Sequence, residues 1–150
     1  MAAQTGRTNK KYMEFWLDNS SGTLTNLSAY CKSVGVYGLK FPTQNVTAFS
    51  DLIENVTNGR PSAPLTITFV KDTTVFAHLV ALNRNTPLSL DIREGIRQSP
   101  QITGEPCFGI SSSATSGYVL GSMTADDESY ICEFDVYGPT APDFATTNHA

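Results

Sequence analysis

The feature that most constrains the fold is the regular alternation of apolar and polar side chains over residues 129–137. Successive side chains of a β-strand point to opposite faces, so this pattern predicts a strand with one buried and one solvated face. The buried face would carry Tyr130, Cys132, Phe134 and Val136. The opposite face would carry Ile131, Glu133, Asp135 and Tyr137. Such a strand needs a second layer of structure to cover its apolar side.

Further segments have the composition of strands. Residues 65–70 (LTITFV) give the clearest signal, because β-branched side chains alternate there between turn-forming residues. Strands are also expected over residues 12–18, 34–37, 45–49, 88–92, 102–113 and 117–123. The turn at residues 19–22 contains Gly22, which is free to adopt a positive φ. Residues 25–30 predict a helical turn capped by Thr25 or Asn26.

One segment, about residues 74–83, has the periodicity of a helix. Asp72 stands where an N-cap residue is expected. The apolar side chains recur at helical spacing and form one broad face, made of Val75, Phe76, Leu79, Val80 and Leu82. The sequence therefore predicts a single helix longer than two turns, within residues 72–84.

The chain is expected to form one domain over residues 1–150, because it shows no internal repeat and no boundary, and its length suits one core. The fold class predicted is mainly β: a β-sandwich or partly closed barrel with one packed α-helix. Residues 1–10 are expected to be a mobile N-terminal arm, and residues 139–150 a polar C-terminal tail. Residues 50–64 read as a polar loop, longer than compact domains usually carry, which indicates a function for it.

Charge is distributed unevenly along the chain. The net charge is −4, and no Lys or Arg follows Arg97. The acidic residues of this last part include candidates for a negative surface: Asp126, Asp127, Glu128, Glu133 and Asp135. Such a surface repels nucleic acid, so specific DNA binding is not expected. No apolar run approaches the roughly 20 residues of a membrane helix, and no signal-peptide core opens the sequence, so synthesis in the cytoplasm without a secretion route is expected.

No catalytic, metal or cofactor site is predicted. The two histidines are His78, within the helical segment, and His149, within the tail. The three cysteines are widely spaced and read as small buried side chains. The acidic triplet at residues 126–128 is better explained as a hairpin tip than as a Ca²⁺ loop. One alternative stays open, namely a sugar- or peptide-binding groove lined by aromatic residues, with Phe15, Trp16, Tyr30 and Tyr37 as its candidates.

The order of these segments resembles the tail tube (major tail) proteins of long-tailed bacteriophages. Residues 15–30 (FWLDNSSGTLTNLSAY) are similar to that family's opening strand, which ends in an Asp-polar-Gly-Thr turn and leads into an Asn-Leu-Ser-x-Tyr turn. Residues 46–51 (VTAFSD) resemble its Thr-Ala-Phe-Gly-Asp segment, with Ser50 in place of the usual Gly. The long loop, the strand at residues 65–69 and the helix follow in the family's order, although Asn-Gly-Arg-Pro stands where a Pro-Gly-Leu piece is expected. The resemblance covers about residues 12–82, and residues 134–138 (FDVYG) are compatible with it.

The resemblance implies a structural virion subunit that assembles into stacked hexameric rings. These rings form the tail tube, the conduit for DNA ejection, and their partners are other copies of the chain, the tape measure protein and other tail proteins. Residues 50–64 would then be a ring-stacking loop, with its contact residues at Asp51, Glu54, Asn55, Asn58 and Arg60. Acidic residues on the lumen wall would let DNA slide. Two alternatives remain: a capsid decoration (cement) protein and a β-sandwich ligand-binding module.

Overall fold

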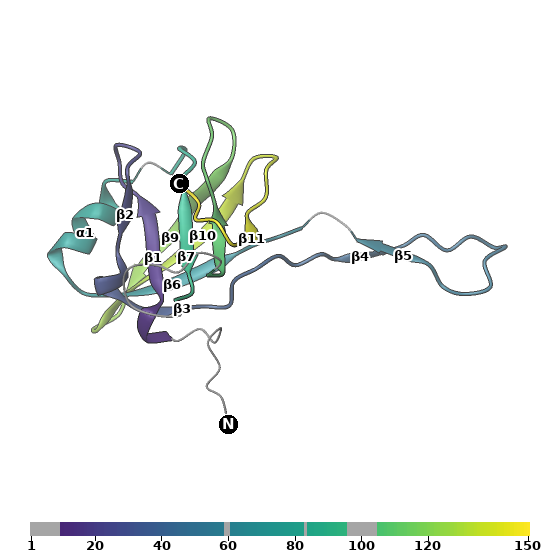
Figure 1. Ribbon diagram of the computed structural model, residues 1–150, viewed down its shortest axis with the longest axis horizontal. Coiled ribbons are helices and arrows are strands. Elements are labelled where there is room, and N and C mark those ends of the chain that lie inside the picture. The colour runs from purple at the N-terminus through teal and green to yellow at the C-terminus, as the bar shows by residue number, and fades with distance from the viewer. Residues whose placement is uncertain (1–9, 59–60, 83, 96–104) are drawn as a thin grey trace, which may run out of the picture.

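A computed structural model describes residues 10–58, 61–82, 84–95 and 105–150. The described chain is mainly β, with two sheets that form a body and a separate hairpin that projects from it (Figure 1). The first sheet has five strands, in the order β11-β8-β7-β1-β2. Their bounds are Glu14–Asp18 for β1, Leu24–Asn26 for β2, Leu90–Arg93 for β7, Cys107–Ile110 for β8 and Asp143–Ala145 for β11.

The second sheet has four antiparallel strands, in the order β3-β6-β10-β9. Their bounds are Cys31–Val34 for β3, Leu65–Val70 for β6, Gly117–Ala125 for β9 and Ser129–Tyr137 for β10. β9 and β10 form a hairpin whose register shifts between Glu133 and Phe134. One isolated bridge, between Leu88 and Tyr118, links the two sheets at one corner.

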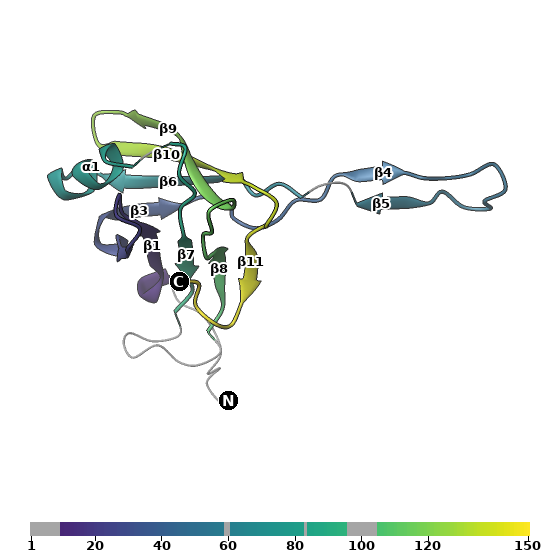
Figure 2. The same cartoon turned by 90° about the horizontal axis from the view of Figure 1, so that it is seen from above.

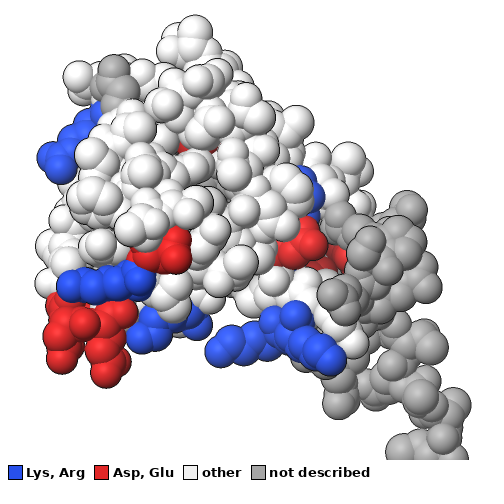
Figure 3. All heavy atoms as spheres, turned by 90° about the vertical axis from the view of Figure 1, so that its left-hand side faces the viewer, with Lys and Arg blue, Asp and Glu red and all other residues white. Residues whose placement is uncertain are grey.

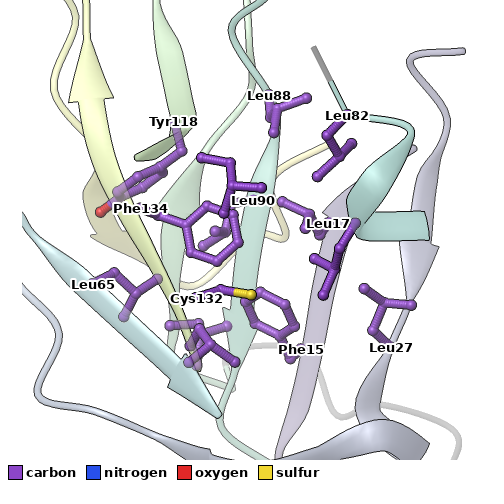
Figure 4. Close-up of a cluster of buried hydrophobic side chains, with 14 of the residues drawn as sticks. Phe15, Leu17, Leu27, Leu65, Leu82, Leu88, Leu90, Tyr118, Cys132 and Phe134 are labelled. Carbon is purple, nitrogen blue, oxygen red and sulfur yellow. The ribbon is translucent and has the colours of Figure 1, made fainter. Parts of the chain in front are cut away.

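The hydrophobic core fills the space between the two sheets (Figure 4). Phe15 and Leu90 enter it from the five-stranded sheet, while Leu65, Cys132 and Phe134 enter it from the four-stranded sheet. The hydroxyl group of the buried Tyr118 donates a hydrogen bond of 3.0 Å to the carbonyl oxygen of Ala63, so this polar group is satisfied inside an apolar core. The described residues form no closed barrel, and the part of the sequence prediction that the structure confirms is a mainly β chain with one α-helix.

The alternation over residues 129–137 has the predicted structural consequence. Cys132 and Phe134 are fully buried in the core, whereas Glu133 and Asp135 are exposed on the opposite face. The bounds predicted for β6 and β10 agree with the structure. These are the two central strands of their sheet, where alternation reports burial most directly.

The predicted helix is α1 (Thr73–Val80), and its N-cap is Asp72, whose Oδ1 accepts a hydrogen bond of 2.8 Å from the Thr74 N–H. Val75 and Leu79 point into the core. The prediction of a broad apolar face that includes Phe76 and Val80 is wrong, because both side chains are exposed. Only the i, i+4 stripe of this two-turn helix faces the sheets, and α1 is the only α-helix in the described residues.

This arrangement predicts different costs for two neighbouring truncations in α1. We expect Leu79→Ala to lower the free energy of unfolding by about 2–5 kcal/mol, because it leaves a cavity at a fully buried site. Val80→Ala, at an exposed site of the same helix, should change it by less than about 0.5 kcal/mol. Urea unfolding followed by circular dichroism measures both values, and equal costs for the two variants would contradict this packing.

Several predicted boundaries differ from the structure near the first turn. Gly22 has the expected positive φ, 79°. Residues 24–26 are strand β2 instead of a helical turn, and a short 3-10 helix follows at Ser28–Tyr30. The N-cap position of this helix is occupied by Leu27 and not by the predicted Thr25 or Asn26, although the Asn26 Oδ1 accepts a hydrogen bond of 2.9 Å from the Ser28 N–H. The strand predicted over residues 34–37 lies earlier, at β3.

The hairpin that leaves the body replaces the loop predicted over residues 50–64. It consists of β4 (Thr43–Asn45) and β5 (Val56–Asn58), with a tip at residues 46–55 (Figures 1 and 2). The strand predicted over residues 45–49 is β4, displaced toward the N-terminus. All of β4 is exposed, so no alternation of burial marks it in the sequence. We call residues 39–62 the arm; residues 59–60 within it lie outside the described part.

The predicted N-terminal arm at residues 1–10 lies outside the described residues except for Lys10, which begins a short 3-10 helix at Lys10–Tyr12. The segment 139–150, predicted as a tail, contains β11, which pairs with β8. No helix among the described residues is long and apolar enough to cross a membrane.

Candidate functional site

The tip of the arm is held in shape by its own polar side chains. The Asp51 carboxylate accepts hydrogen bonds from the Ala48 N–H at 2.7 Å and from the Asn55 Nδ2 at 2.9 Å. These bonds favour the charged form, first that from Ala48 and then that from Asn55, and they lower the pKa of Asp51. The Thr47 hydroxyl oxygen accepts a hydrogen bond of 2.7 Å from the Asn55 N–H. The tip is therefore a turn of defined structure, held by side-chain hydrogen bonds.

These contacts place the residues that were predicted for the loop. Asp51 and Asn55 shape the tip, and the Glu54 Oε1 accepts a hydrogen bond of 3.0 Å from the Asn45 Nδ2 across the hairpin. Asn58 pairs through its backbone with Thr43 at the base side of β5. Arg60 lies outside the described residues. Four of the five candidates thus belong to one hairpin, in which side chains from three of them stabilise the tip.

The tip presents apolar side chains that sequence reasoning did not single out. Phe49 and Leu52 are fully exposed, and Ile53 is largely exposed. We call these three residues the apolar tip. Phe41, Val46 and Val56 expose further apolar surface along the arm. Soluble proteins seldom expose a contiguous group of this kind unless it meets a partner.

An apolar hollow lies where the arm joins the body. Its volume is about 410 Å³. It is lined by Val36, Tyr37, Gly38, Leu39, Lys40, Pro64 and Thr66. Of these lining residues, Val36 is exposed, whereas Tyr37 is held in place by a 2.6 Å hydrogen bond from its hydroxyl group to Glu94. The molecule thus carries an apolar projection at one end of the arm and an apolar recess at the other.

The acidic candidates occupy the hairpin of β9 and β10. Asp126 shapes its turn, because its Oδ1 accepts hydrogen bonds from the Glu128 and Ser129 N–H groups at 2.8 and 2.7 Å. These bonds lower the pKa of Asp126. Glu128 lies 3.9 Å from Lys32 in an exposed ion pair. On the face in Figure 3, acidic groups stand beside basic ones and form no continuous acidic surface.

Glu133 and Asp135 lie apart from this turn, on the outer face of β10. The Ser122 hydroxyl group donates a hydrogen bond of 3.1 Å to the Glu133 Oε2 across the hairpin. The five acidic candidates therefore form two groups: Asp126, Asp127 and Glu128 at the turn, and two outward carboxylates in the middle of the sheet.

A buried polar cluster lies on the outer face of the five-stranded sheet. Asp91 of β7, Cys107 of β8 and His149 bring one carboxylate oxygen, one sulfur and one ring nitrogen within 4.8 Å of one another. Asp91 and Cys107 are fully buried. The expectation that His149 belongs to a loose tail is wrong, since His149 Nδ1 lies 2.9 Å from Asp91 Oδ1 and its Nε2 lies 2.7 Å from Asp143 Oδ1.

The burial of β7 and the residues before it departs from the sequence prediction. The cluster accounts for Asp91, whereas Ser89 is hydrogen-bonded to Asp18 and Ser112. Residues 88–92 were expected to be half-buried, but Ser89 and Asp91 are buried as well as their apolar neighbours. The segment 147–149 covers the outer face of the strands, as the Cys107 thiol donates a hydrogen bond of 3.2 Å to the Thr147 carbonyl oxygen. The burial of this outer face could not be predicted from residues 88–92 themselves, because the residues that cover it come from the far end of the chain.

The structure also gives the surroundings of the other residues considered for chemistry. His78 Nε2 lies 2.9 Å from the Asp18 carbonyl oxygen, and burial lowers the pKa of the imidazole. Burial raises the pKa of Cys132 to about 12. It also raises that of Cys107 to about 11, with Asp91 adding to the effect, so neither is an activated nucleophile. Of the aromatic residues proposed for a groove, Phe15 is in the core and Trp16 lies 4.3 Å beneath the Arg93 guanidinium group.

Comparison with known proteins finds no family model that matches the chain and no curated protein with significant similarity to it.

Proposed function

We propose that this chain is a structural subunit that assembles with copies of itself, as a tail tube protein of a long-tailed bacteriophage. The observation that carries the proposal is the arm, whose apolar tip has a fixed shape and is covered by none of the described residues. The length of the arm also supports assembly. At about 3.3 Å per residue, the path from Lys40 to Phe49 is roughly 30 Å, and the arm points away from the body (Figures 1 and 2).

The partner that best fits the apolar tip is a second copy of the chain. The hollow at the base of the arm offers an apolar recess, but the arm extends away from it, so a tip can enter only the hollow of another copy. Such a contact joins two different surfaces of identical subunits. Contacts of this kind repeat head to tail and give open stacks instead of closed dimers.

Open sheet edges supply a second means of association. β9 is a nine-residue strand at the edge of its sheet, with β3 at the other edge. Long edge strands are templates for pairing with another chain. Lateral pairing of subunits would join their sheets into a ring, and the β-sandwich of tail-tube type with hexameric rings is the form that the family resemblance implies.

The acidic side chains fit this proposal in one of two ways. Glu133 and Asp135 lie on the wet face of β10 and would line either the lumen or the outer surface of a tube. Negative charge on the lumen wall would keep DNA from adhering during ejection. A lumen lined instead by Lys and Arg from residues 1–97 would contradict this sliding function.

The two alternatives differ in how they use the arm. A capsid decoration protein would insert it into a capsid surface and form no filaments by itself. A ligand-binding module would use the hollow of about 410 Å³ for a small molecule or peptide and would remain monomeric. The fixed shape of the tip favours assembly over the ligand-binding module, because a ligand-binding hollow gives no role to a projecting apolar turn. Filament formation by the purified chain distinguishes assembly from capsid decoration.

Deleting residues 54–60 tests the proposal. We expect the shortened chain to keep the circular dichroism spectrum and urea midpoint of the wild type, because none of the described arm residues from 40 to 62 contributes to the core. Sedimentation velocity should show large assemblies for the wild type and monomers for the deletion. Normal assembly of the deletion variant would show that the arm does not drive stacking.

A further inference from the structure

The buried polar cluster owes its composition to the register of the five-stranded sheet. Asp91 pairs with Gly109, and Gly109 pairs with Asp143, so the two aspartates flank a glycine in one row across β7, β8 and β11. Cys107 lies two residues before Gly109 and therefore shares its face. A side chain at position 109 would collide with the Leu90 carbonyl oxygen, so only glycine fits between the two carboxylates in this row. The His149 ring lies between Asp91 and Asp143 and contacts both.

The distances within the cluster fit a metal-binding group. His149 Nδ1 lies 2.9 Å from Asp91 Oδ1 and 3.8 Å from Cys107 Sγ. Ligand atoms around a tetrahedral zinc ion with ordinary bond lengths are roughly 3.3–3.7 Å apart. Small side-chain adjustments would therefore place all three atoms at bonding distance from one ion. Among the described residues, this is the only group of His, Cys, Asp and Glu side chains gathered so closely.

The surroundings orient the three groups as a metal site requires. Asp143 Oδ1 faces the Nε2 of His149 at 2.7 Å, which is the carboxylate–histidine arrangement that directs the other ring nitrogen at a metal. The Arg93 Nε donates a hydrogen bond of 2.7 Å to Asp91 Oδ2, so Oδ1, which lies 2.9 Å from His149 Nδ1, is the oxygen that faces the shared centre. Asp91 and His149 are thus each fixed on the side away from this centre, while the Cys107 thiol is oriented by its hydrogen bond of 3.2 Å to the Thr147 carbonyl oxygen.

The number of hydrogen bonds that His149 can donate favours a cation at this centre. Both nitrogens of His149 face carboxylate oxygens, and a neutral imidazole has only one N–H to donate. If that N–H is on Nε2 and faces Asp143, the lone pair of Nδ1 points at the negative Asp91. A metal ion at Nδ1 turns this repulsive contact into two bonds to the same ion. Without a metal, one additional proton has to be shared among the imidazole and the two carboxylates.

We propose that Asp91, Cys107 and His149 bind a divalent transition-metal ion, with Zn²⁺ as the ion that this set of ligands fits best. Sulfur and nitrogen ligands select such ions over Mg²⁺ and Ca²⁺, which prefer oxygen. Binding replaces the thiol proton of Cys107 by the metal, and the proton passes to solvent. The charges then balance, because Zn²⁺ and Arg93 offset the Cys107 thiolate, Asp91 and Asp143. Water completes the tetrahedral site.

Metal binding would stabilise the C-terminal part of the fold. The ligands come from β7, from β8 and from the segment that follows β11, which lies across the outer face of this sheet (Figure 2). The metal would fasten residues 147–149 to the sheet and so stabilise β11, which is only three residues long. This inference does not depend on the proposed assembly, because it concerns a different face of the molecule from the arm.

Cobalt provides a direct test, since Co²⁺ occupies zinc sites and gives an absorption band when a thiolate binds it. We expect the chelator-treated, folded chain to show this charge-transfer band at one equivalent of Co²⁺ and to lose it when Zn²⁺ is added. C107S and H149Q should abolish the band. D143N should weaken metal affinity about 10–100-fold, because Asp143 orients the histidine without binding the metal. C31S and H78Q, which change the same residue types elsewhere, should keep it.

The result that would overturn the proposal is equally direct. Absence of the band in the folded wild-type chain, or a band that survives C107S, would show that the cluster is a metal-free hydrogen-bonded clasp. Circular dichroism confirms that each variant is folded. H149Q serves as the second variant if C107S does not fold, because His149 lies over the outer face of the sheet and is not part of the hydrophobic core.

Discussion

Replacing the three residues of the apolar tip by serine (F49S, L52S and I53S together) should abolish assembly while leaving the monomer folded. Burying each of these side chains at an interface contributes about 1.5–3 kcal/mol, so the combined loss exceeds what most subunit contacts tolerate. None of the three belongs to the core. Sedimentation velocity and light scattering should therefore show monomers with an unchanged urea midpoint.

The matched control removes exposed apolar surface elsewhere. Phe76 and Val80 are exposed on α1, at the end of the body opposite the arm (Figure 1). F76S and V80S together should leave assembly intact, because α1 is not part of the arm and does not line the hollow. Loss of assembly in this control, or normal assembly of the tip variant, would show that general surface hydrophobicity and not the arm drives association.

Phe134→Ala should lower the free energy of unfolding by about 3–5 kcal/mol, the largest effect expected from a single core truncation. Phe134 is fully buried between the sheets, where it lies among Leu65, Leu90 and Tyr118 (Figure 4). Domains of this size are stable by only about 5–15 kcal/mol. The variant should therefore unfold at markedly lower urea concentration, as followed by circular dichroism.

The neighbouring residue on the same strand supplies the control. Glu133 is exposed and makes one surface hydrogen bond, to Ser122. Glu133→Ala should change the free energy of unfolding by less than about 0.5 kcal/mol. Comparable losses at positions 133 and 134 would mean that β10 does not have one buried and one solvated face.

The parts of the fold that could be predicted from the sequence are those whose signal is local. β6 and β10 alternate in burial, and α1 begins at a capping residue, Asp72. Each of these elements could therefore be predicted from a short stretch of sequence. The arm could not be recognised as a hairpin, because none of β4 is buried and its polar composition is also that of a loop. Its strands are defined by pairing across the tip, which leaves no periodic pattern.

The candidate sites follow the same division. The contact role of Asp51 and Asn55 in ring stacking stays a prediction, but these polar residues of the arm could be singled out from the length of the segment and from the family resemblance. The apolar tip could not, because an exposed Phe49 looks the same in a sequence as a buried one. Asp91, Cys107 and His149 are far apart along the chain, and only the register of β7, β8 and β11 brings them together.

Electron microscopy of the purified wild-type chain tests the central claim most directly. The account predicts rings that stack into hollow tubes, with adjacent rings joined where an arm enters the next subunit. Monomers or small closed oligomers at every protein concentration, with no rings and no filaments, would contradict it.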